Sequence, residues 1–280
     1  MIIIADGGST KVEWRAISET GSVKGITTPG INPVFLSEDE IFASFGEKLS
    51  VLPADEVSEV WYYGAGLVSD ETKATLCGAL KRVFPAAECH AESDLMAAAR
   101  SLCGREPGIA CILGTGANSC LYDGTSIVAN IRAGGFILGD EASGAYFGRR
   151  LLSDYIKGLL PAPVRSEMDS RFGLDYPTIV KKVYSEPMPS RYLASFAPFI
   201  REFKHHPHIT QMLRTGFDEF LRRNVAQYDT RKYAVSFTGS IAFYFKEELQ
   251  KSLAAAGMRE GRIVRAPMDG LIAYHREGRV

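Results

Sequence analysis

The chain has 280 residues, 46 % of them hydrophobic, so it can bury a large core in one or two domains. Its net charge of −1 argues against nucleic-acid binding, which needs a surplus of Lys and Arg. No apolar run approaches the roughly 20 residues of a membrane span, and the N-terminus has no basic leader of the secretory type. We therefore expect a cytoplasmic protein that acts on small molecules.

The five cysteines stand at positions 77, 89, 103, 111 and 120. Their number is odd, no two of them have CxxC spacing, and three lie in apolar segments. This usage is typical of reduced, mostly buried thiols in a cytosolic protein. We therefore expect free thiols throughout.

Three strands joined by tight turns are predicted at the start of the chain. Residues 2–5 form a short apolar run, residues 12–17 alternate between apolar and polar, and residues 23–27 follow a Gly-Ser turn. A dinucleotide-binding βαβ unit would need a helix directly after its first strand. The pattern therefore predicts a meander and not a Rossmann fold.

Helices and strands alternate in the next segment. Ser37 and Glu40 form a capping box at the start of a helix whose apolar face runs to Leu49. Two further strands and two further helices are expected at 57–63, 88–91, 70–83 and 94–102. The run Arg-Glu-Pro-Gly at 105–108 then predicts a domain boundary.

After this boundary the opening pattern recurs. An apolar strand at 109–113 leads into a turn of small residues at 114–119, a return strand at 120–122 and, past an Asp-Gly hairpin signal, a strand at 127–131. Two copies of one pattern suggest two related α/β domains that face each other across a cleft.

The remainder of the chain is mostly helical in pattern. Residues 141–232 are broken by prolines and carry the least information. A strand at 233–237 precedes a third small-residue turn and a helix at 241–253, and residues 267–274 predict a terminal helix.

The first turn has the composition of a phosphate-binding loop. Adjacent glycines remove the Cβ barrier to close approach of backbone amides, hydroxyl groups add donors, and a lysine supplies positive charge. The candidate nucleotide ligands are Gly7, Gly8, Ser9, Thr10 and Lys11. Asp6, at the end of the strand, is placed to hold Mg²⁺ through water, because Mg²⁺ gives up its hydration reluctantly. An ordinary hairpin turn is the alternative for an isolated cluster of this kind.

The second turn, with Gly114, Thr115 and Gly116, is of the same type and stands at the equivalent place in the second half. Two such turns from facing domains could clamp the β- and γ-phosphates from both sides. The sequence contains neither the GxxxxGK[ST] motif of a P-loop nor a GxGxxG motif that opens a helix.

In their order along the chain, these motifs resemble those of the actin, sugar-kinase and Hsp70 superfamily. Within it the sequence is most similar to the N-acetylglucosamine kinase branch, which also contains the BadF-BadG-BcrA-BcrD ATPases. Four segments are similar to the first phosphate, second phosphate, connecting and adenosine motifs, namely 6–11, 113–119, 134–144 and 237–241. The adenosine motif contributes Gly239 and Ser240.

The resemblance implies an α/β fold of two actin-like, ribonuclease H-like domains that flank an ATP cleft. The expected domains are residues 1–107 and 108–280, with a helical insertion at about 141–232. In the family a terminal helix, here at about 267–280, crosses back to the first domain, which would make that domain discontinuous.

The resemblance also implies an activity. The expected reaction is ATP- and Mg²⁺-dependent phosphorylation of an amino-sugar hydroxyl, with N-acetylglucosamine converted to N-acetylglucosamine 6-phosphate, or glucosamine as the acceptor. The family's catalytic base is an aspartate that begins a helix between the two phosphate motifs, and Asp94 fits that position. The alternative role for Asp94 is favourable interaction with the helix dipole.

Further residues match sugar-binding positions of the family. They are Asn32, Thr115, Gly116, Asn118 and Asp140, and a carboxylate flanked by glycines suits capture of a diol. For Asn32, turn chemistry before a proline is the alternative. The family places a tryptophan six residues before its aspartate, whereas here Phe136 stands four residues before Asp140, so the aromatic wall of the sugar pocket is shortened or shifted.

Other functions remain as alternatives. An ATPase activator of the BadF/BadG type would hold an iron–sulfur cluster through paired cysteines in a glycine-rich context, which the sequence does not show. A sugar-sensing regulator would need a DNA-binding segment before residue 6. His205, His206 and His208 could be read as a metal site, but a basic surface loop is the simpler interpretation. A homodimer is left open.

Overall fold

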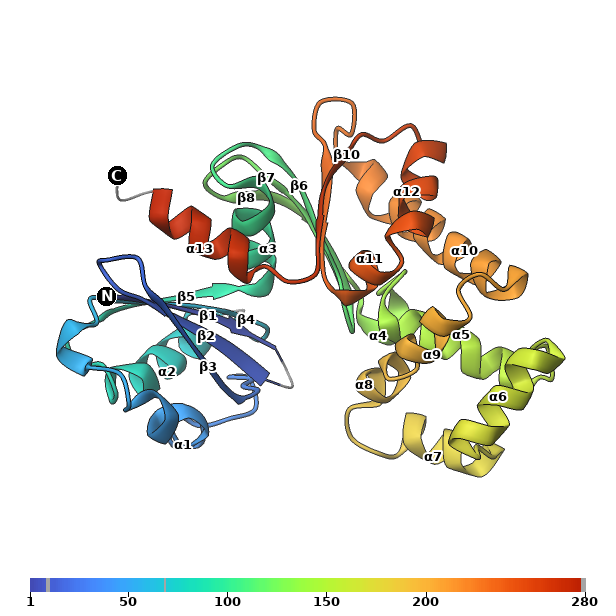
Figure 1. The fold of residues 1–280 in the computed structure, drawn as a ribbon, viewed down its shortest axis with the longest axis horizontal. Helices are drawn as coiled ribbons and strands as arrows, with labels where there is room; N and C mark the ends of the chain where they lie inside the picture. Colours follow the sequence, from blue (N-terminus) through green and yellow to red (C-terminus); the bar gives the residue numbers. More distant parts are fainter. Residues whose placement is uncertain (9–10, 68, 278–280) are drawn as a thin grey trace. The chain divides into compact units, whose positions relative to one another are not determined.

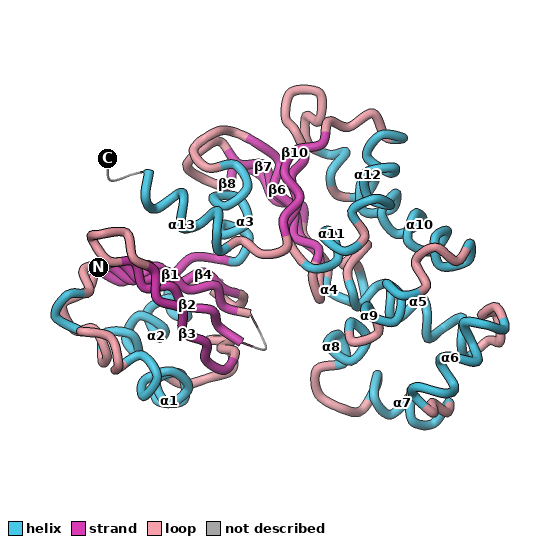
Figure 2. The backbone as a smooth tube through the Cα atoms, in the orientation of Figure 1, coloured by secondary structure: helices cyan, strands magenta, loops and turns pink. Residues whose placement is uncertain are grey.

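The computed structural model describes residues 1–8, 11–67 and 69–277 and divides the chain into two units (Figure 1). Unit 1 consists of Met1–Gly104 and Pro267–Val280, and unit 2 of Arg105–Ala266. Each unit is built on one five-stranded mixed sheet (Figure 2). The predicted α/β class with two actin-like domains is confirmed.

The sheet of unit 1 has the strand order β3-β2-β1-β4-β5. The strands are β1 (Ile2–Gly7), β2 (Lys11–Ile17), β3 (Val23–Pro29), β4 (Glu59–Gly64) and β5 (Glu88–Ser93). The first three form the predicted antiparallel meander, and β1, β4 and β5 run parallel. The carboxyl ends of β1, β4 and β5 therefore share one edge of the sheet, where ligands bind in open α/β sheets.

Helices cover both faces of this sheet. They are α1 (Glu38–Leu49), α2 (Asp70–Lys81), α3 (Asp94–Cys103) and α13 (Met268–Glu277), with a 3₁₀ turn at Ala54–Glu56. The capping box of Ser37 and Glu40 is present at α1. Alternate residues of β1 face opposite sides, so that Ile3 packs in a core with α1 and α2, whereas Ile4 packs in a smaller core with α3 and α13.

The terminal helix α13 belongs to unit 1. Met268 and Leu271 are buried against Ile4 and Tyr63. The Tyr63 hydroxyl lies 2.8 Å from Nε2 of the buried His275. Unit 1 is therefore discontinuous in sequence, with its last helix supplied from the end of the chain.

The sheet of unit 2 has the order β10-β9-β6-β7-β8. Its strands are β6 (Gly108–Leu113), β7 (Ala117–Tyr122), β8 (Ile127–Ile131), β9 (Val235–Thr238) and β10 (Glu260–Val264). β6, β7 and β8 repeat the antiparallel meander, and β9 lies parallel to β6 as β4 lies parallel to β1. The order of the four strands β3-β2-β1-β4 thus recurs as β8-β7-β6-β9.

Most of the helices lie in unit 2. They are α4 (Gly135–Leu138), α5 (Gly144–Ile156), α6 (Ala162–Phe172), α7 (Tyr176–Tyr184), α8 (Pro189–Ala194), α9 (Ala197–Glu202), α10 (Pro207–Arg223), α11 (Ser240–Tyr244) and α12 (Lys246–Ala255), with a 3₁₀ turn at Val225–Gln227. One large core joins α5 and α10 to the sheet. None of the helices in the described residues combines the length and hydrophobicity that a bilayer-spanning segment needs.

Three sequence expectations differ from the structure. The turn predicted at 114–119 ends at residue 116, because Ala117–Tyr122 form β7. The helix predicted at 241–253 is two helices, since Phe245, at φ −110° and ψ 30°, leaves helical geometry between α11 and α12. The strand β10 was not predicted, because Glu260–Val264 is polar and only partly buried.

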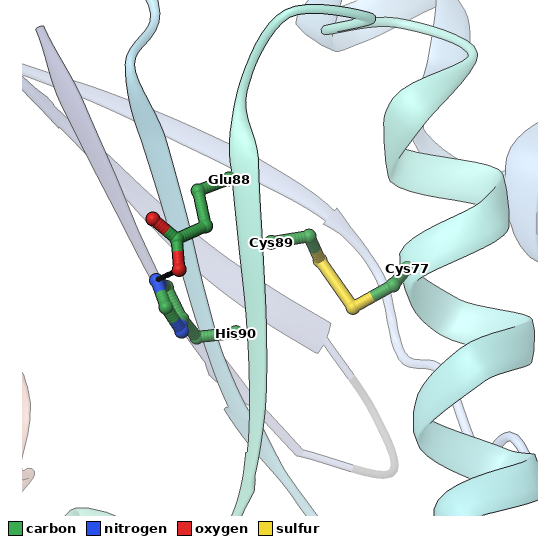
Figure 3. The surroundings of a disulfide bond; sticks show 4 residues. All are labelled: Cys77, Glu88, Cys89 and His90. Atoms are coloured by element: carbon green, nitrogen blue, oxygen red, sulfur yellow. Dashed lines mark ion pairs between the residues drawn. A yellow bond between two sulfur atoms is a disulfide. The ribbon is translucent and has the colours of Figure 1, made fainter.

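The expectation of free thiols is wrong for two of the five cysteines. Cys77 of α2 and Cys89 of β5 form a disulfide, with Cα atoms 5.7 Å apart (Figure 3). On β5, Cys89 points towards α2, whereas Glu88 and His90 lie on the other side of the strand (Figure 3). The spacing of twelve residues shows no recognisable motif, and only the packing of α2 on β5 brings the two sulfurs together.

Candidate active site

The carboxyl edge of the unit 1 sheet carries the first group of predicted site residues. Asp6 and Gly7 end β1, Lys11 begins β2, and the N–H of Gly8 donates to the carbonyl of Lys11 at 3.0 Å. Ser9 and Thr10, predicted to bind nucleotide, lie outside the described residues. Asp94 is the first residue of α3, directly after β5 and its N-cap Ser93.

Two acidic groups lie near each other at this edge. Burial, and then the charges of Glu13 and Asp94, raise the pKa of Asp6 from 3.8 to about 6, while Lys11 lowers it. Burial also raises the pKa of Asp94, although the N–H groups of Leu95 and of Asp94 itself oppose the shift. Such a pair of partly buried acids is costly without a ligand, and perturbed carboxylates of this kind gather at functional sites.

Lys11 makes an ion pair with Glu13 and remains 59 % exposed. Glu13 also lies opposite Asp6 in the β1–β2 ladder. The lysine is therefore close enough to Asp6 to lower its pKa, and it lies at the end of the turn.

Close main-chain packing explains the glycines at this edge. A Cβ on Gly7 would lie 2.5 Å from Cζ of Tyr62 and closer still to its hydroxyl oxygen. A Cβ on Gly64 would lie 2.7 Å from Cε1 of the same tyrosine. The turn thus lies directly on the Tyr62 ring, and any side chain at either position would displace it.

Asn32 occupies a loop beside the end of β4. Its Oδ1 accepts a hydrogen bond of 3.1 Å from the N–H of Val34. The same side chain fills the space that a Cβ on Gly66 would need, and Gly66 has φ +83°. The turn-chemistry interpretation of Asn32 therefore has direct support, and its Nδ2 group is left for any role in sugar binding.

In unit 2 the second turn is fixed from inside by α5. The N–H groups of Gly144 and Ala145 donate to the carbonyls of Gly114 and Thr115, at 2.8 and 3.1 Å. The N–H and C=O of one peptide unit point in opposite directions. The N–H groups of Thr115 and Gly116 are therefore directed away from the helix, as an anion-binding turn requires.

Asp140 lies beside this turn. Its Oδ1 accepts from the N–H of Ala117 at 3.2 Å, and a Cβ on Gly116 would lie 3.1 Å from its Oδ2. Both Asp140 and Ala142 have positive φ, 54° and 59°. Backbone strain at non-glycine residues is characteristic of functional sites. Burial, opposed by the Ala117 hydrogen bond and assisted by Glu141, raises the pKa of Asp140.

Gly239 and Ser240 link β9 to α11 beside the same turn. Gly239 has φ +118°, and a Cβ there would collide with the carbonyl of Leu113. Ser240 is the exposed first residue of α11. The structure therefore brings Gly114, Thr115, Gly116, Asp140 and Gly239 together within unit 2.

Two predicted sugar ligands are engaged elsewhere. Asn118 is a residue of β7 whose Oδ1 accepts from the N–H of Ser119 and from Nδ2 of Asn130, both at 2.9 Å. Phe136, in the short helix α4, is partly buried against the unit 2 core. Its neighbours Ile137 and Leu138 are instead exposed, by 68 % and 80 %. Asn118 and Phe136 are both only partly buried, and their roles in sugar binding stay predictions.

The donor set at the unit 1 edge suits Mg²⁺ carried by a nucleotide. The described residues contain no cluster of three His, Cys, Asp or Glu side chains that could hold a metal by themselves. Mg²⁺ in nucleotide sites takes one or two carboxylates and completes its shell with phosphate and water. Asp6 provides such a carboxylate, and a Cβ on Gly8 would meet only the carbonyl of Lys11, at 3.4 Å, so the main chain there is open to a phosphate.

Two of the three histidines at 205–208 have structural partners. His206 caps α10, and Nε2 of His208 lies 2.9 Å from Oδ2 of Asp154.

Glu13 and Tyr62, by contrast, are site residues that the sequence did not indicate. Glu13 is an ordinary polar position on an alternating strand, and Tyr62 is an ordinary core residue until the register of β1 and β4 is known.

Comparisons with known proteins place the chain in a family. No protein-family model matches it, and no curated protein sequence matches it. A structure from Porphyromonas gingivalis, of a protein provisionally assigned as an N-acetylglucosamine kinase, superposes with a TM-score of 0.92 at 37 % identity, over 100 % of both chains.

Two more distant structures share the fold. The first, from Chromobacterium violaceum and with the same provisional assignment, has a TM-score of 0.72 at 18 % identity over 98 % of each chain. The second, a ROK family glucokinase from Streptomyces griseus in complex with glucose and AMPPNP, has a TM-score of 0.56 at 15 % identity over 99 % of this chain and 98 % of the other. The match to the Porphyromonas gingivalis protein, at 37 % identity over the full length of both chains, shows that the chain belongs to the N-acetylglucosamine kinase family of actin-like proteins.

Proposed function

We propose that the protein transfers the γ-phosphoryl group of ATP to a hydroxyl of an amino sugar, with N-acetylglucosamine as the acceptor and its 6-phosphate as the product. The observation that supports this most directly is the pair of partly buried acids, Asp6 and Asp94, at the sheet edge that also carries the glycine turn. The likeness to the Porphyromonas gingivalis protein supports the choice of acceptor.

Asp94 is the proposed general base. It accepts the proton of the acceptor hydroxyl as that oxygen forms its bond to the γ-phosphorus, and the bond from the γ-phosphorus to the β–γ bridging oxygen breaks to release ADP. Burial raises the pKa of Asp94 and so increases its affinity for the proton. Asp94 is the first residue of α3, and N–H groups at the start of the helix hold its carboxylate.

Asp6 and the two turns are proposed to hold the nucleotide. Asp6 would hold Mg²⁺ through water, and the metal, when bound, neutralises charge on the phosphates. At the first turn the main chain at Gly8 carries no side chain and its N–H donates to the carbonyl of Lys11, while Lys11 supplies positive charge for the phosphates. In unit 2 the outward N–H groups of Thr115 and Gly116 offer hydrogen-bond donors to the phosphates, with Gly239 and Ser240 assigned to the adenosine side.

The sugar ligands are proposed with different support. Asp140 is a buried, strained carboxylate beside the second turn, and its Oδ2 is suited to accept from sugar hydroxyls. Asn32 would use its Nδ2 group for this purpose, because it is Oδ1 that accepts the hydrogen bond within the loop. The exposed Ile137 and Leu138, close in sequence to Asp140, could take the place of the aromatic wall.

An ATP-consumption assay across a panel of sugars tests the proposal. The panel contains N-acetylglucosamine, glucosamine, N-acetylmannosamine, glucose and a no-sugar control. We expect turnover to depend on the acceptor and to be greatest with N-acetylglucosamine. Preference for glucosamine would correct the acceptor alone, whereas hydrolysis that no sugar stimulates would refute the kinase and favour a partner-activating ATPase.

A further inference from the structure

Tyr62 presents a buried polar atom that the proposed mechanism does not use. Its side chain is fully buried, and its hydroxyl has no hydrogen-bond partner among the residues that the structure describes. A buried, unsatisfied hydroxyl destabilises a folded protein, so each such group in a native structure calls for an explanation. Its place beneath Gly7, at the base of the nucleotide turn, suggests one.

The second half of the chain shows what this position needs for packing alone. The N–H of Gly8 donates to Lys11 across the first turn as the N–H of Gly114 donates to Gly116 across the second. Counting back from these equivalent glycines, Ala5 corresponds to Cys111, and their partners in the next parallel strand are Tyr62 and Phe237.

Phe237 is fully buried, like Tyr62, and packs in the core of unit 2. A phenyl ring therefore fills this position of the fold without a hydroxyl. The oxygen atom of Tyr62 is an addition in unit 1, the unit that also carries Asp6 and Asp94.

The second turn also shows how an anion-binding turn is fixed from inside. There the carbonyls of Gly114 and Thr115 face inward and accept from the N–H groups of α5. A turn that directs its N–H groups outward to a phosphate must direct carbonyls inward. α5 packs in the same core as Phe237, which marks the corresponding face of the sheet.

We propose that Tyr62 is a positioning residue for the nucleotide turn: its hydroxyl donates to the inward-facing carbonyl of Gly8, the counterpart of Gly114, when a nucleotide phosphate is bound to the turn. The inference rests on the proposed function, because it assigns the phosphate to this turn. In unit 1 the tyrosine hydroxyl does for the turn what the N–H groups of α5 do in unit 2.

The test compares two tyrosine variants. Tyr62→Phe removes the unpartnered hydroxyl, and Tyr122→Phe removes a hydroxyl that donates to the carbonyl of Gly124 at 2.8 Å in a side chain that is just as buried. Nucleotide affinity is measured by calorimetry with Mg–AMPPNP, a non-transferable probe, and the thermal unfolding midpoint is measured without ligand.

We expect Tyr62→Phe to bind Mg–AMPPNP about 3- to 10-fold more weakly, the effect of one net hydrogen bond. Its ligand-free unfolding midpoint should equal or exceed that of the wild type, because no native hydrogen bond is lost. Tyr122→Phe should show the reverse, with a lower midpoint and unchanged affinity.

Unchanged affinity in Tyr62→Phe, or a lowered ligand-free midpoint like that of Tyr122→Phe, would overturn the inference and leave the proposed function standing. Failure of the wild type to bind Mg–AMPPNP would overturn the proposed function and the inference with it.

Discussion

The two sheet edges of this molecule have the same framework and different chemistry. Their strand orders correspond, and in both units the main chain that enters the turn packs against a glycine, Gly64 in unit 1 and Gly239 in unit 2. Yet the position of Asp6 in unit 1 corresponds to Ile112 in unit 2. In the proposed function, the duplicated framework therefore carries the acids for metal binding and catalysis, Asp6 and Asp94, on one copy, and the other copy binds ligands through its main chain and Asp140.

The largest expected effect distinguishes the proposed general base, Asp94, from the proposed sugar ligand, Asp140. Asp94→Asn should lower kcat by about 10²- to 10⁴-fold, because it removes general base catalysis, and leave the Kd for N-acetylglucosamine nearly unchanged. Asp140→Asn should instead raise the Kd and KM for the sugar. Steady-state kinetics and sugar-binding calorimetry on both variants measure the contrast, and wild-type turnover in Asp94→Asn would remove this residue from the mechanism.

The next effect concerns the glycine that closes the unit 2 edge. Gly239→Ala should destabilise the protein by about 3 kcal/mol or more, because φ is +118° and the new Cβ would collide with the carbonyl of Leu113. Gly257→Ala is the matched control, since Gly257 has φ +64° and nothing within 4 Å of a Cβ. Urea unfolding of both variants checks this; equal losses would mean that backbone conformation alone matters at residue 239.

A smaller effect depends on pH and concerns Asp6 of unit 1. The pKa of Asp6 rises from 3.8 to about 6 on folding, so the folded protein binds more protons than the unfolded chain between these pH values. Stability of the metal-free protein therefore falls as pH rises from about 4 to 6, by at most about 3 kcal/mol.

Asp6→Asn should reduce this dependence, to which Asp94 and Asp140 also contribute, and stabilise the protein at pH 7.5 in EDTA, although Mg²⁺-dependent turnover is lost. Unfolding curves at pH 5 and 7.5 measure it. The same pH dependence in the variant would show that another group is responsible.

The smallest effect is that of the disulfide, which only unit 1 contains among the described residues. Opening a loop of this length removes at most about 3 kcal/mol in the chain-entropy description. Reduction with dithiothreitol should therefore lower the unfolding midpoint of the wild type slightly and leave the double variant Cys77→Ser, Cys89→Ser unaffected. An equal response in both proteins would place the effect at another site.

Most of the fold could be predicted from local signals in the sequence. The meanders, the capping box of Ser37 and Glu40, and the start of α3 after Ser93 all depend on residues within a few positions of one another, so the sequence could predict them. The repeat of small-residue turns predicted two domains because it needs only the order of elements. The break at Phe245 and the polar strand β10 depend on tertiary packing, and local periodicity does not record it.

The site was predictable to a smaller extent. Asp6, Asp94 and the glycines follow from a motif order, whereas the engagement of Asn118 by Asn130 depends on cross-strand pairing. The same holds for the Cys77–Cys89 disulfide and for Tyr62, whose partners are far apart in the chain. Roles that arise from strand register and helix packing cannot be predicted from the sequence before the fold is known.

The return of α13 to unit 1 has a consequence for synthesis. One face of the first sheet, including Ile4 and Tyr63, is covered by Met268 and Leu271, which are synthesised after the whole of unit 2. During translation that face stays apolar and unprotected while unit 2, contiguous in sequence, can complete its own core. Unit 1, whose translation begins before that of unit 2, is therefore completed after it, and the nascent chain is exposed to aggregation until α13 emerges.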